Sequence, residues 1–536
     1  MKHGGVVSMD QWDQELQDGM INFMNYYLSH GPVEKVIEGA ELAKVFADTH
    51  ISFEAAARYR QELGGFFTSA VQLKGLPGLS IELLEQLAYL VCQLDLGRLS
   101  ALLPGTTENN KVDAYVNGPD CLQVLLEEIN QAERYIHLSV MLFFNDHAGN
   151  KVVQALLDAR ARGVVVRVMV DYGITAVGYN SNLKYGDFGS LAEQLEAAGC
   201  QLINTFTTSY NNVDWESKRK ELAAAGVPEH GLFLQDYVQE QVTTGLNVIN
   251  HRKFLVIDGV TSIVGSINVG DQYLFETPVV SEGDPKTRIE GTKLGYPAKE
   301  DEWHDGCFRI RGAAAYSLNQ IFVFQWTVLG GDVFDPADDF YYPEMDRRFG
   351  EEQCTLFASF PGNPVNLIQQ YYLDLLKYAG DETIIVNPYL IDNAFWETLE
   401  SLEEEQARHI IICNPLNVND HPTNKAAVQS HMYAPFHKGV SYYDYSKTGR
   451  FSHWKITYDA RAHCVFHGSY NINERSACHD FELGILVKSA SFADKVRGII
   501  GYDLSVSEQV ADDKAFFKHP YLHPSTYFNK ITEYFT

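Results

Sequence analysis

Residues 251–268 read HRKFLVIDGVTSIVGSIN, and residues 453–471 read HWKITYDARAHCVFHGSYN. Each stretch has a histidine two residues before a lysine, then an apolar run, an aspartate and the sequence Gly-Ser-x-Asn. Side chains alternate between the faces of an extended strand, so the histidine and lysine of each copy point to the same side and both can reach one anion. If the two copies had no function, their likeness would require two independent coincidences.

The two copies differ in spacing. Four residues separate Lys253 from Asp258, whereas three separate Lys455 from Asp459. The interval from the histidine to the glycine of Gly-Ser is 14 residues in the first copy and 15 in the second. We interpret this as a longer hairpin turn at residues 460–463, with the histidine, lysine and asparagine kept. Asp258 is expected to close the tight turn of the first hairpin, and Asp459 is expected to have the same structural role.

Helix and strand patterns repeat around the two motifs. Periodicity predicts alternating helices and strands at 121–134, 135–144, 152–162 and 164–170, and again at 367–377, 383–388, 393–404 and 409–413. This alternation indicates an α/β fold with a largely parallel sheet. A repeat about 200 residues long indicates a domain duplication. Two lobes should then face each other across a pseudo-twofold axis, with both histidines in one cleft.

The chain divides into three expected regions. Residues 1–103 have helical periodicity and predict a helical appendage, while the first lobe is expected over 112–340 and the second over 350–536. Residues 104–110, PGTTENN, are rich in turn formers and predict a linker.

The charge balance bears on the class of substrate. The 536 residues include 42 Lys and Arg against 70 Asp and Glu, which gives a formal charge of −28 with no cluster of basic residues. Such a field repels polyanions, and nucleic-acid affinity rests on cationic contacts with phosphates. The composition therefore disfavours a nuclease and gives no support to strong adhesion to anionic lipid.

Cysteine usage and hydropathy bear on the compartment. The eight cysteines are scattered and form no Cys-x-x-Cys pair, so we expect reduced thiols and no zinc. Residues 1–18 carry acidic side chains where a signal peptide needs an apolar core, and no run of about 18 apolar residues occurs. We expect a protein that is cytoplasmic or peripheral to a membrane, and export by another route stays open.

The paired motifs resemble those of the phospholipase D superfamily, in which His-x-Lys-x4-Asp is followed by a Gly-Gly or Gly-Ser pair and an asparagine. With Asn247 and Asn250 just upstream, the first copy is most similar to the cardiolipin synthase and bacterial phospholipase D branch. The resemblance implies an α/β fold of two phospholipase D-like lobes, covering about residues 112–510. It also implies that Asp305, after a tryptophan, accompanies the first motif, and that Glu482 accompanies the second.

The residues suit cleavage of a phosphodiester without a metal or other cofactor. A neutral imidazole can attack phosphorus, and a second, protonated imidazole can protonate the departing oxygen. Asp305 and Glu482 are the candidates to bind the far ring nitrogen of each histidine. The resemblance implies that His251 becomes phosphorylated and that His453 acts as acid and then as base. The residues expected to neutralise the nonbridging oxygens are Lys253, Lys455, Asn268, Asn471, Ser266 and Ser469.

These observations predict a phospholipase D-type phosphodiesterase or phosphatidyltransferase with a phospholipid substrate and peripheral contact with the membrane. Water as acceptor gives hydrolysis to phosphatidic acid, and an alcohol such as glycerol or phosphatidylglycerol gives transfer. The motif does not distinguish between these acceptors. The alternatives are a nuclease of the same superfamily and an inactive binding protein that keeps the fold.

Overall fold

The structure is a computed structural model. It describes residues 21, 24, 53–64, 67, 70–78, 80, 105–175, 188–206, 215–225, 248–274, 302–335, 338–343, 348–359, 366–511 and 516–517.

The described strands form one sheet of 15 strands. The first lobe contributes β1 (Gly105–Val116), β2 (Tyr135–Val140), β3 (Val165–Val170), β4 (Gln201–Asn204), β5 (Phe254–Ile257), β6 (Thr261–Gly265) and β7 (Gly306–Arg311). The second lobe contributes β8 (Glu352–Ser359), β9 (Thr383–Val386), β10 (Ile410–Asn414), β11 (Ser441–Asp444), β12 (Ile456–Asp459), β13 (Cys464–Gly468), β14 (Glu482–Lys488) and β15 (Glu508–Gln509).

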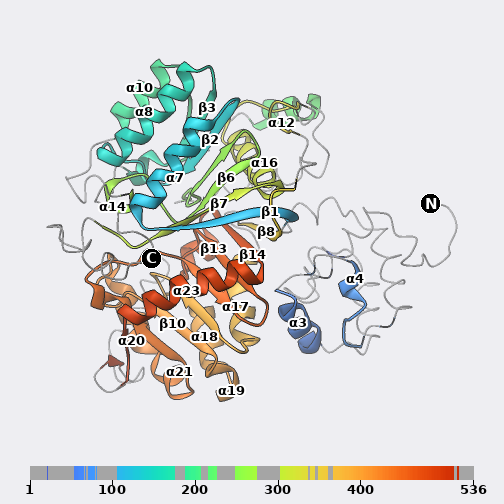
Figure 1. Cartoon of the computed structure of the whole chain (residues 1–536), viewed down its shortest axis with the longest axis vertical. Coiled ribbons are helices and arrows are strands. Elements are labelled where there is room, and N and C mark those ends of the chain that lie inside the picture. Colours follow the sequence, from blue (N-terminus) through green and yellow to red (C-terminus); the bar gives the residue numbers. More distant parts are fainter. Residues whose placement is uncertain are drawn as a thin grey trace.

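The strand order repeats about the centre of this sheet. From the centre outward the first lobe runs β1-β7-β6-β5-β2-β3-β4, and the second runs β8-β14-β13-β12-β9-β10-β11 with β15 added at its edge. Corresponding strands therefore occupy the same places in the two lobes. The central strands β1 and β8 pair antiparallel, with Gly105 opposite Leu356, and join the lobes (Figure 1). This arrangement confirms the duplicated α/β fold.

The expectation of a largely parallel sheet is wrong. Parallel pairing occurs at β2–β3, β3–β4, β9–β10 and β10–β11, and every other described pair is antiparallel. The helix-strand alternation that we read at the start of each lobe does produce the parallel pairs. The motif hairpins β5–β6 and β12–β13 have short turns, which can only join antiparallel strands.

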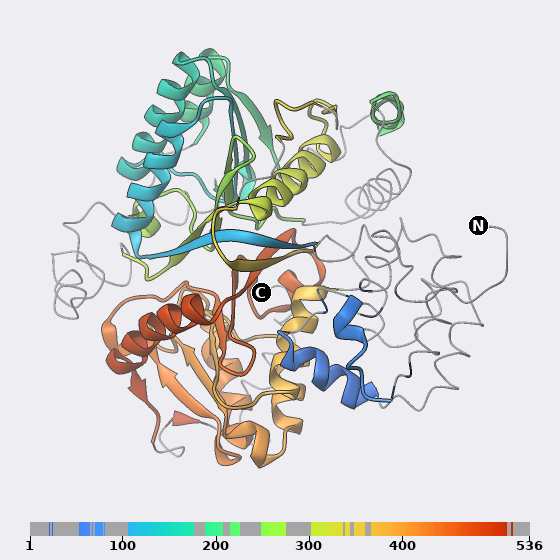
Figure 2. The ribbon, with the colours of Figure 1, turned by 45° about the vertical axis from the view of Figure 1, so that its right-hand side comes forward.

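Helices cover both faces of the sheet (Figure 2). The first lobe has α7 (Gly118–Gln131), α8 (His147–Ala161), α10 (Gly189–Ala197), α12 (Trp215–Ala224), α14 (Asp271–Leu274) and α16 (Ala313–Val328). The second has α17 (Leu367–Lys377), α18 (Asn393–Ser401), α19 (Glu404–Ala407), α20 (Pro422–His431), α21 (Tyr433–His437), the 3-10 helix η2 (Tyr445–Thr448), α22 (Glu474–Cys478) and α23 (Ala490–Val506). The predicted bounds of α17 are confirmed, and Asn366 caps it by accepting the amides of residues 368 and 369.

Apolar packing joins the two lobes. Phe322 of α16 and Ile500 of α23 belong to one buried cluster with strands from both halves of the sheet. A separate cluster lies under α7, α8 and α10 in the first lobe. Burial across the junction favours one fixed arrangement of the lobes.

The motif hairpins differ as the spacing predicts. The first hairpin has a three-residue turn at 258–260, between the paired residues Ile257 and Thr261, in which Asp258 and Gly259 adopt positive φ angles of 55° and 71°. The second has the longer turn at residues 460–463. A side chain at Gly265 or Gly468 would place its Cβ 2.6 Å or 2.2 Å from a backbone carbonyl oxygen of the neighbouring strand, so only glycine fits at either position.

Residues 105–110 do not form the expected linker, because they are the first half of β1. Of the predicted helical region, α3 (Phe53–Glu62) and α4 (Ala70–Leu73) are helical, and most of the remainder lies outside the described residues. In α3, Arg60 pairs with Asp374 of α17 at 2.6 Å, which fixes the helix to the second lobe. None of the helices described here combines the length and hydropathy that crossing a bilayer requires.

Candidate active site

Each His-x-Lys segment is held by the backbone of the other lobe. The amide of His251 donates to the carbonyl oxygen of Phe481 at 3.0 Å, and Asn250 bridges to the same residue. The amide of His453 donates to the carbonyl oxygen of His304 at 2.8 Å. Phe481 directly precedes Glu482, and His304 directly precedes Asp305. The lobe contact therefore places each acid beside the histidine of the opposite lobe.

The two histidine–carboxylate pairs cross between the lobes. Nδ1 of His251 lies 2.8 Å from Oε1 of Glu482, and Nδ1 of His453 lies 2.8 Å from Oδ2 of Asp305. All four side chains are buried. Sequence order groups Asp305 with the first motif and Glu482 with the second, but in space the partners are exchanged. A lobe taken alone would lack the carboxylate that orients its own histidine.

The motif serines hold these carboxylates, which differs from the expected contact with phosphate oxygens. Ser266 donates to Oδ1 of Asp305, and Ser469 donates to Oε2 of Glu482. A third hydroxyl, Ser476 on α22, donates to Oε1 of Glu482 at 2.5 Å. The serines lie one residue after the motif glycines, where the close approach of strands β7 and β14 brings the carboxylates into reach. Ser476 was missed, since nothing in the local sequence marks it.

The lysines and asparagines complete the polar set. Nζ of Lys253 donates to the carbonyl oxygen of His251 at 2.5 Å, and Nζ of Lys455 donates to that of His453 at 2.7 Å. Oδ1 of Asn268 accepts the Leu142 amide at 3.0 Å. Its buried Nδ2 has no partner within the described residues, so a donor is available to an incoming oxygen. The Oδ1 of Asn471 is likewise without a partner there.

Burial sets the charge state of the histidines. It lowers the pKa of His251 to about 4 and that of His453 to about 3, although the neighbouring carboxylates act in the opposite direction. Both rings are thus neutral at pH 7. With Nδ1–H donated to a carboxylate, Nε2 of each ring keeps its lone pair.

The remaining charges form one coupled group. Burial alone would raise the pKa of Asp305 and of Glu482, but the adjacent histidine and lysine lower both. Burial lowers the pKa of Lys253 to about 8 and that of Lys455 to about 7. Lys253, in the other motif, also lowers the pKa of Lys455. Glu482, the partner of His251, raises it. The two motifs therefore share one electrostatic environment.

The structural aspartates lie outside this group. Asp258 accepts the backbone amides of residues 133, 134 and 135 at 2.8–2.9 Å. Asp459 accepts the amide of Arg461 at 3.1 Å inside the longer turn. Both carboxylates satisfy backbone donors at hairpin ends, away from the histidines.

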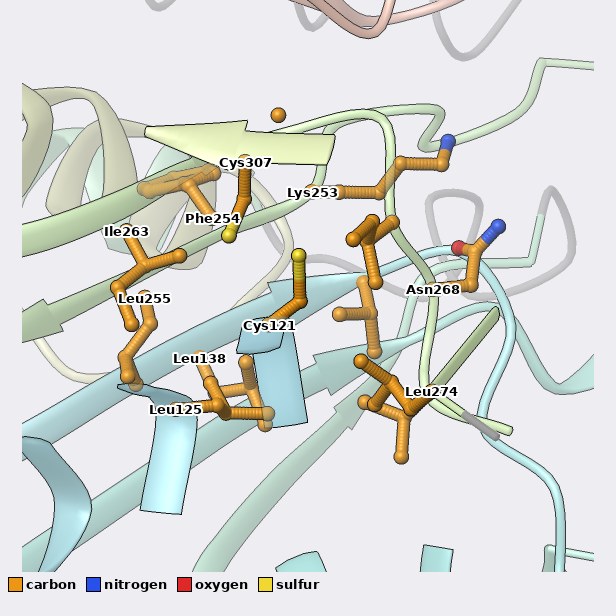
Figure 3. Close-up of a pocket in the computed structure, with 14 residues that line it drawn as sticks. Cys121, Leu125, Leu138, Lys253, Phe254, Leu255, Ile263, Asn268, Leu274 and Cys307 are labelled. Carbon is orange, nitrogen blue, oxygen red and sulfur yellow. The ribbon is translucent and has the colours of Figure 1, made fainter. Parts of the chain in front are cut away.

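A small apolar cavity of about 40 Å³ lies behind the first motif (Figure 3). Lys253 and Asn268 close one end of it, and their polar ends point away from walls that include Cys121, Leu138 and Cys307. A volume of this size holds at most a few small molecules such as water, far less than an acyl chain.

The arrangement supplies the parts of a nucleophilic displacement at phosphorus. It offers two neutral imidazoles, each oriented by a carboxylate, together with two ammonium groups and an amide donor. The described part of the chain has no group of three or more His, Cys, Asp or Glu placed to hold a metal ion.

The fold and the paired motifs define a member of the phospholipase D superfamily. The family described as "Cardiolipin synthase, PLD-like domain" matches residues 125–277 and 372–503, more than half of the chain. The chain belongs to this family.

Similar proteins agree with this placement. Cardiolipin synthase 1 of Staphylococcus aureus (strain MRSA252) is 26% identical over 413 residues, covering 76% of this chain and 70% of that protein. Cardiolipin synthase of Oceanobacillus iheyensis is 26% identical over 405 residues, covering 75% and 71%. Among solved structures, phosphatidylserine synthase of Haemophilus influenzae Rd KW20 aligns with a TM-score of 0.55 at 11% identity, covering 79% of this chain and 95% of that one. That structural likeness concerns the fold alone.

Proposed function

We propose that the protein is a phospholipase D-type phosphatidyltransferase that acts on a phospholipid through a covalent phosphohistidine. The observation that carries this proposal is the pairing of His251 with Glu482 and of His453 with Asp305 across the two lobes, which we call the crossed dyads. They present two neutral imidazoles within one buried cluster of charges. The relatives named cardiolipin synthase support a phospholipid substrate, with phosphatidylglycerol as the candidate acceptor.

In the first step Nε2 of His251 attacks phosphorus and forms the N–P bond while the bond to the leaving alcohol breaks. The leaving oxygen takes a proton from His453. Both rings are neutral before substrate binds, and the negative charge of the phosphodiester raises the pKa of His453 so that it is protonated with substrate present. In the second step an acceptor hydroxyl gives its proton to His453 and its oxygen attacks phosphorus, which breaks the bond to His251.

The other site residues act on charge and orientation. Lys253, Lys455 and Asn268 bind the nonbridging oxygens, where negative charge is redistributed in the transition state. Ser266 and Ser469 hold the carboxylates in place.

We also propose that the protein meets the membrane as a peripheral protein. Its substrate lies in a bilayer, and the charge of −28 gives no general attraction to anionic lipid. Contact with the membrane is then confined to the protein surface next to the active site.

The test is product analysis with phosphatidylglycerol vesicles, in the presence and absence of deuterium-labelled glycerol, whose transfer product is labelled phosphatidylglycerol. We expect phosphatidic acid, cardiolipin or both from the natural chain, and neither product from His251→Asn. Asp258→Asn is a matched control in a motif residue that binds only backbone amides. Equal turnover by His251→Asn and the natural chain would overturn the proposal.

A further inference from the structure

The two catalytic histidines lie in different surroundings. Four aromatic rings surround His453, with centroid distances of 5.3 Å to Trp303, 5.4 Å to Tyr273, 5.9 Å to Phe451 and 6.5 Å to Tyr389. Among the residues with described positions, no ring is in such contact with His251. We call these four residues the aromatic collar.

The difference arises at equivalent positions of the duplicated fold. Five residues after the motif asparagine, the first lobe has Tyr273 and the second has Ser476. Two residues before the buried acid, the first lobe has Trp303 and the second has Asp480.

At a third pair of equivalent positions, the aromatic residue is again the one near His453. Two residues before the motif histidine, the second lobe has Phe451 where the first has Ile249. Ser476 binds Glu482, and Asp480 pairs with Arg475 at 2.9 Å, so the side near His251 is more polar. Aromatic residues are thus concentrated at one of two otherwise matching histidines.

The collar lies on the side of phosphorus where alcohols leave and enter. In a displacement by His251, the breaking bond points away from this ring and toward the acid that protonates the leaving oxygen. The acceptor in the second step approaches along the same line, beside His453.

One member of the collar is open to this approach. Tyr273, Phe451 and Tyr389 are 2%, 2% and 5% exposed, whereas Trp303 is only half-buried. The Tyr389 hydroxyl donates to Asp420 at 2.7 Å, which fixes that ring. Trp303 is therefore the collar member that combines exposed apolar surface with a ring contact to His453, at 5.3 Å between centroids.

We infer that the aromatic collar is the binding wall for the acceptor alcohol and that it favours transfer over hydrolysis; this inference rests on the proposed function. Water gains nothing from aromatic surface, whereas the carbon skeleton of an alcohol gains contact area there. Both outcomes balance in the same way, because either acceptor loses one proton to His453 and takes phosphorus from His251. The collar changes which acceptor occupies the site, and so the specificity resides in Trp303 and its neighbours.

The experiment measures how the shared intermediate divides between acceptors. Phosphatidylglycerol vesicles with a fixed concentration of deuterium-labelled glycerol are incubated with the natural chain, Trp303→Ala and Trp303→Phe, and the ratio of phosphatidic acid to labelled phosphatidylglycerol, the transfer product, is recorded. Trp303→Ala should raise this ratio about tenfold, equivalent to about 1.4 kcal/mol. Trp303→Phe should restore most of the natural ratio, since it keeps an aromatic face.

The control is Tyr316→Ala, which removes a half-buried ring on α16 that contacts Tyr342. Its product ratio should equal that of the natural chain. If Trp303→Ala does not fold, Phe451→Leu gives the same test, with a smaller rise expected. An unchanged ratio in a folded, active collar variant would overturn the inference. If the natural chain forms neither product, the proposed function itself has failed.

Discussion

The crossed dyads give each carboxylate a separate task. In the proposed mechanism Glu482 orients His251, the nucleophile, and Asp305 orients His453, the acid and base. The two roles can be separated experimentally, because a good leaving group needs no proton while it still needs a nucleophile.

Glu482→Gln should therefore slow turnover of every substrate by about 100-fold or more, because the neutral amide no longer fixes the tautomer of His251. Asp305→Asn should slow phosphatidylglycerol turnover to a similar degree, but it should retain much of the release of nitrophenol from phosphatidyl-p-nitrophenol. First-turnover rates on the two substrates, measured as the initial burst of released alcohol, check this, because the second step needs His453 as a base whichever alcohol has left. Equal losses on both substrates for Asp305→Asn would contradict the assignment of roles.

The lysines set the expected pH dependence. Their folded pKa values of about 8 for Lys253 and about 7 for Lys455 lie below the usual value near 10.5. Their charge is present at lower pH and is lost as pH rises, so kcat/KM should decline through about pH 7 to 8. Lys455→Arg keeps its charge in this range and should move the decline upward toward the pKa of Lys253. A pH profile with the same alkaline limb in both proteins would contradict this.

At the scale of elements, α3 is attached to the second lobe by a buried ion pair. Arg60 and Asp374 are 1% and 9% exposed in their side chains and lie 2.6 Å apart. Removing one partner leaves an uncompensated buried charge, so Arg60→Ala should destabilise the protein by about 3–5 kcal/mol. Arg348→Ala, in the exposed pair with Glu351, should change stability by about 1 kcal/mol or less.

Denaturant unfolding, followed by circular dichroism, checks these two variants side by side. Arg60→Met combined with Asp374→Leu replaces the pair with apolar side chains and should recover much of the lost stability. Similar midpoints for Arg60→Ala and Arg348→Ala would show that the pair does not hold α3.

Local elements were predictable where short-range patterns decide them. The bounds of α17 and the longer turn at 460–463 follow from periodicity and from motif spacing. Residues 105–110 read as a linker because they are polar. They form a strand because their backbone pairs with β8, about 250 residues away, and no local pattern carries that information.

The candidate site was predictable as a set of residues, and its internal contacts were not. The motif identifies the histidines, lysines and acids, but which acid meets which histidine depends on how two distant segments lie across the lobe contact. The bonds of Ser266 and Ser469 to the carboxylates depend on the same contact. The sequence shows the members of such a network, whereas the fold determines their partners.

At the scale of the molecule, the acidic charge should govern the approach to lipid. Raising the ionic strength from 0.01 M to 0.15 M shortens the Debye length from about 30 Å to about 8 Å. Screening should weaken the long-range repulsion, so cosedimentation with phosphatidylglycerol vesicles should increase over this range. Binding that weakens with salt would instead indicate a dominant basic patch, and it would renew interest in a nucleic-acid substrate.

The shared sheet and the crossed dyads make one site out of two lobes (Figure 1). The lysine of each motif also lowers the pKa of the histidine of the other motif, so both imidazoles belong to one buried cluster of charges. We infer that both histidines act on one phosphorus atom, with His251 bonded to it during turnover.

The most direct test is mass spectrometry of the full chain after brief incubation with phosphatidylglycerol and rapid denaturation at alkaline pH, where phosphohistidine survives. We predict a phosphatidyl adduct on His251 and no adduct in His251→Asn. With phosphatidyl-p-nitrophenol as the donor, whose leaving group needs no proton, His453→Ala should accumulate a larger amount of the adduct, because it lacks the base for the second step. An adduct on His453, or continued turnover by His251→Asn, would contradict this mechanism.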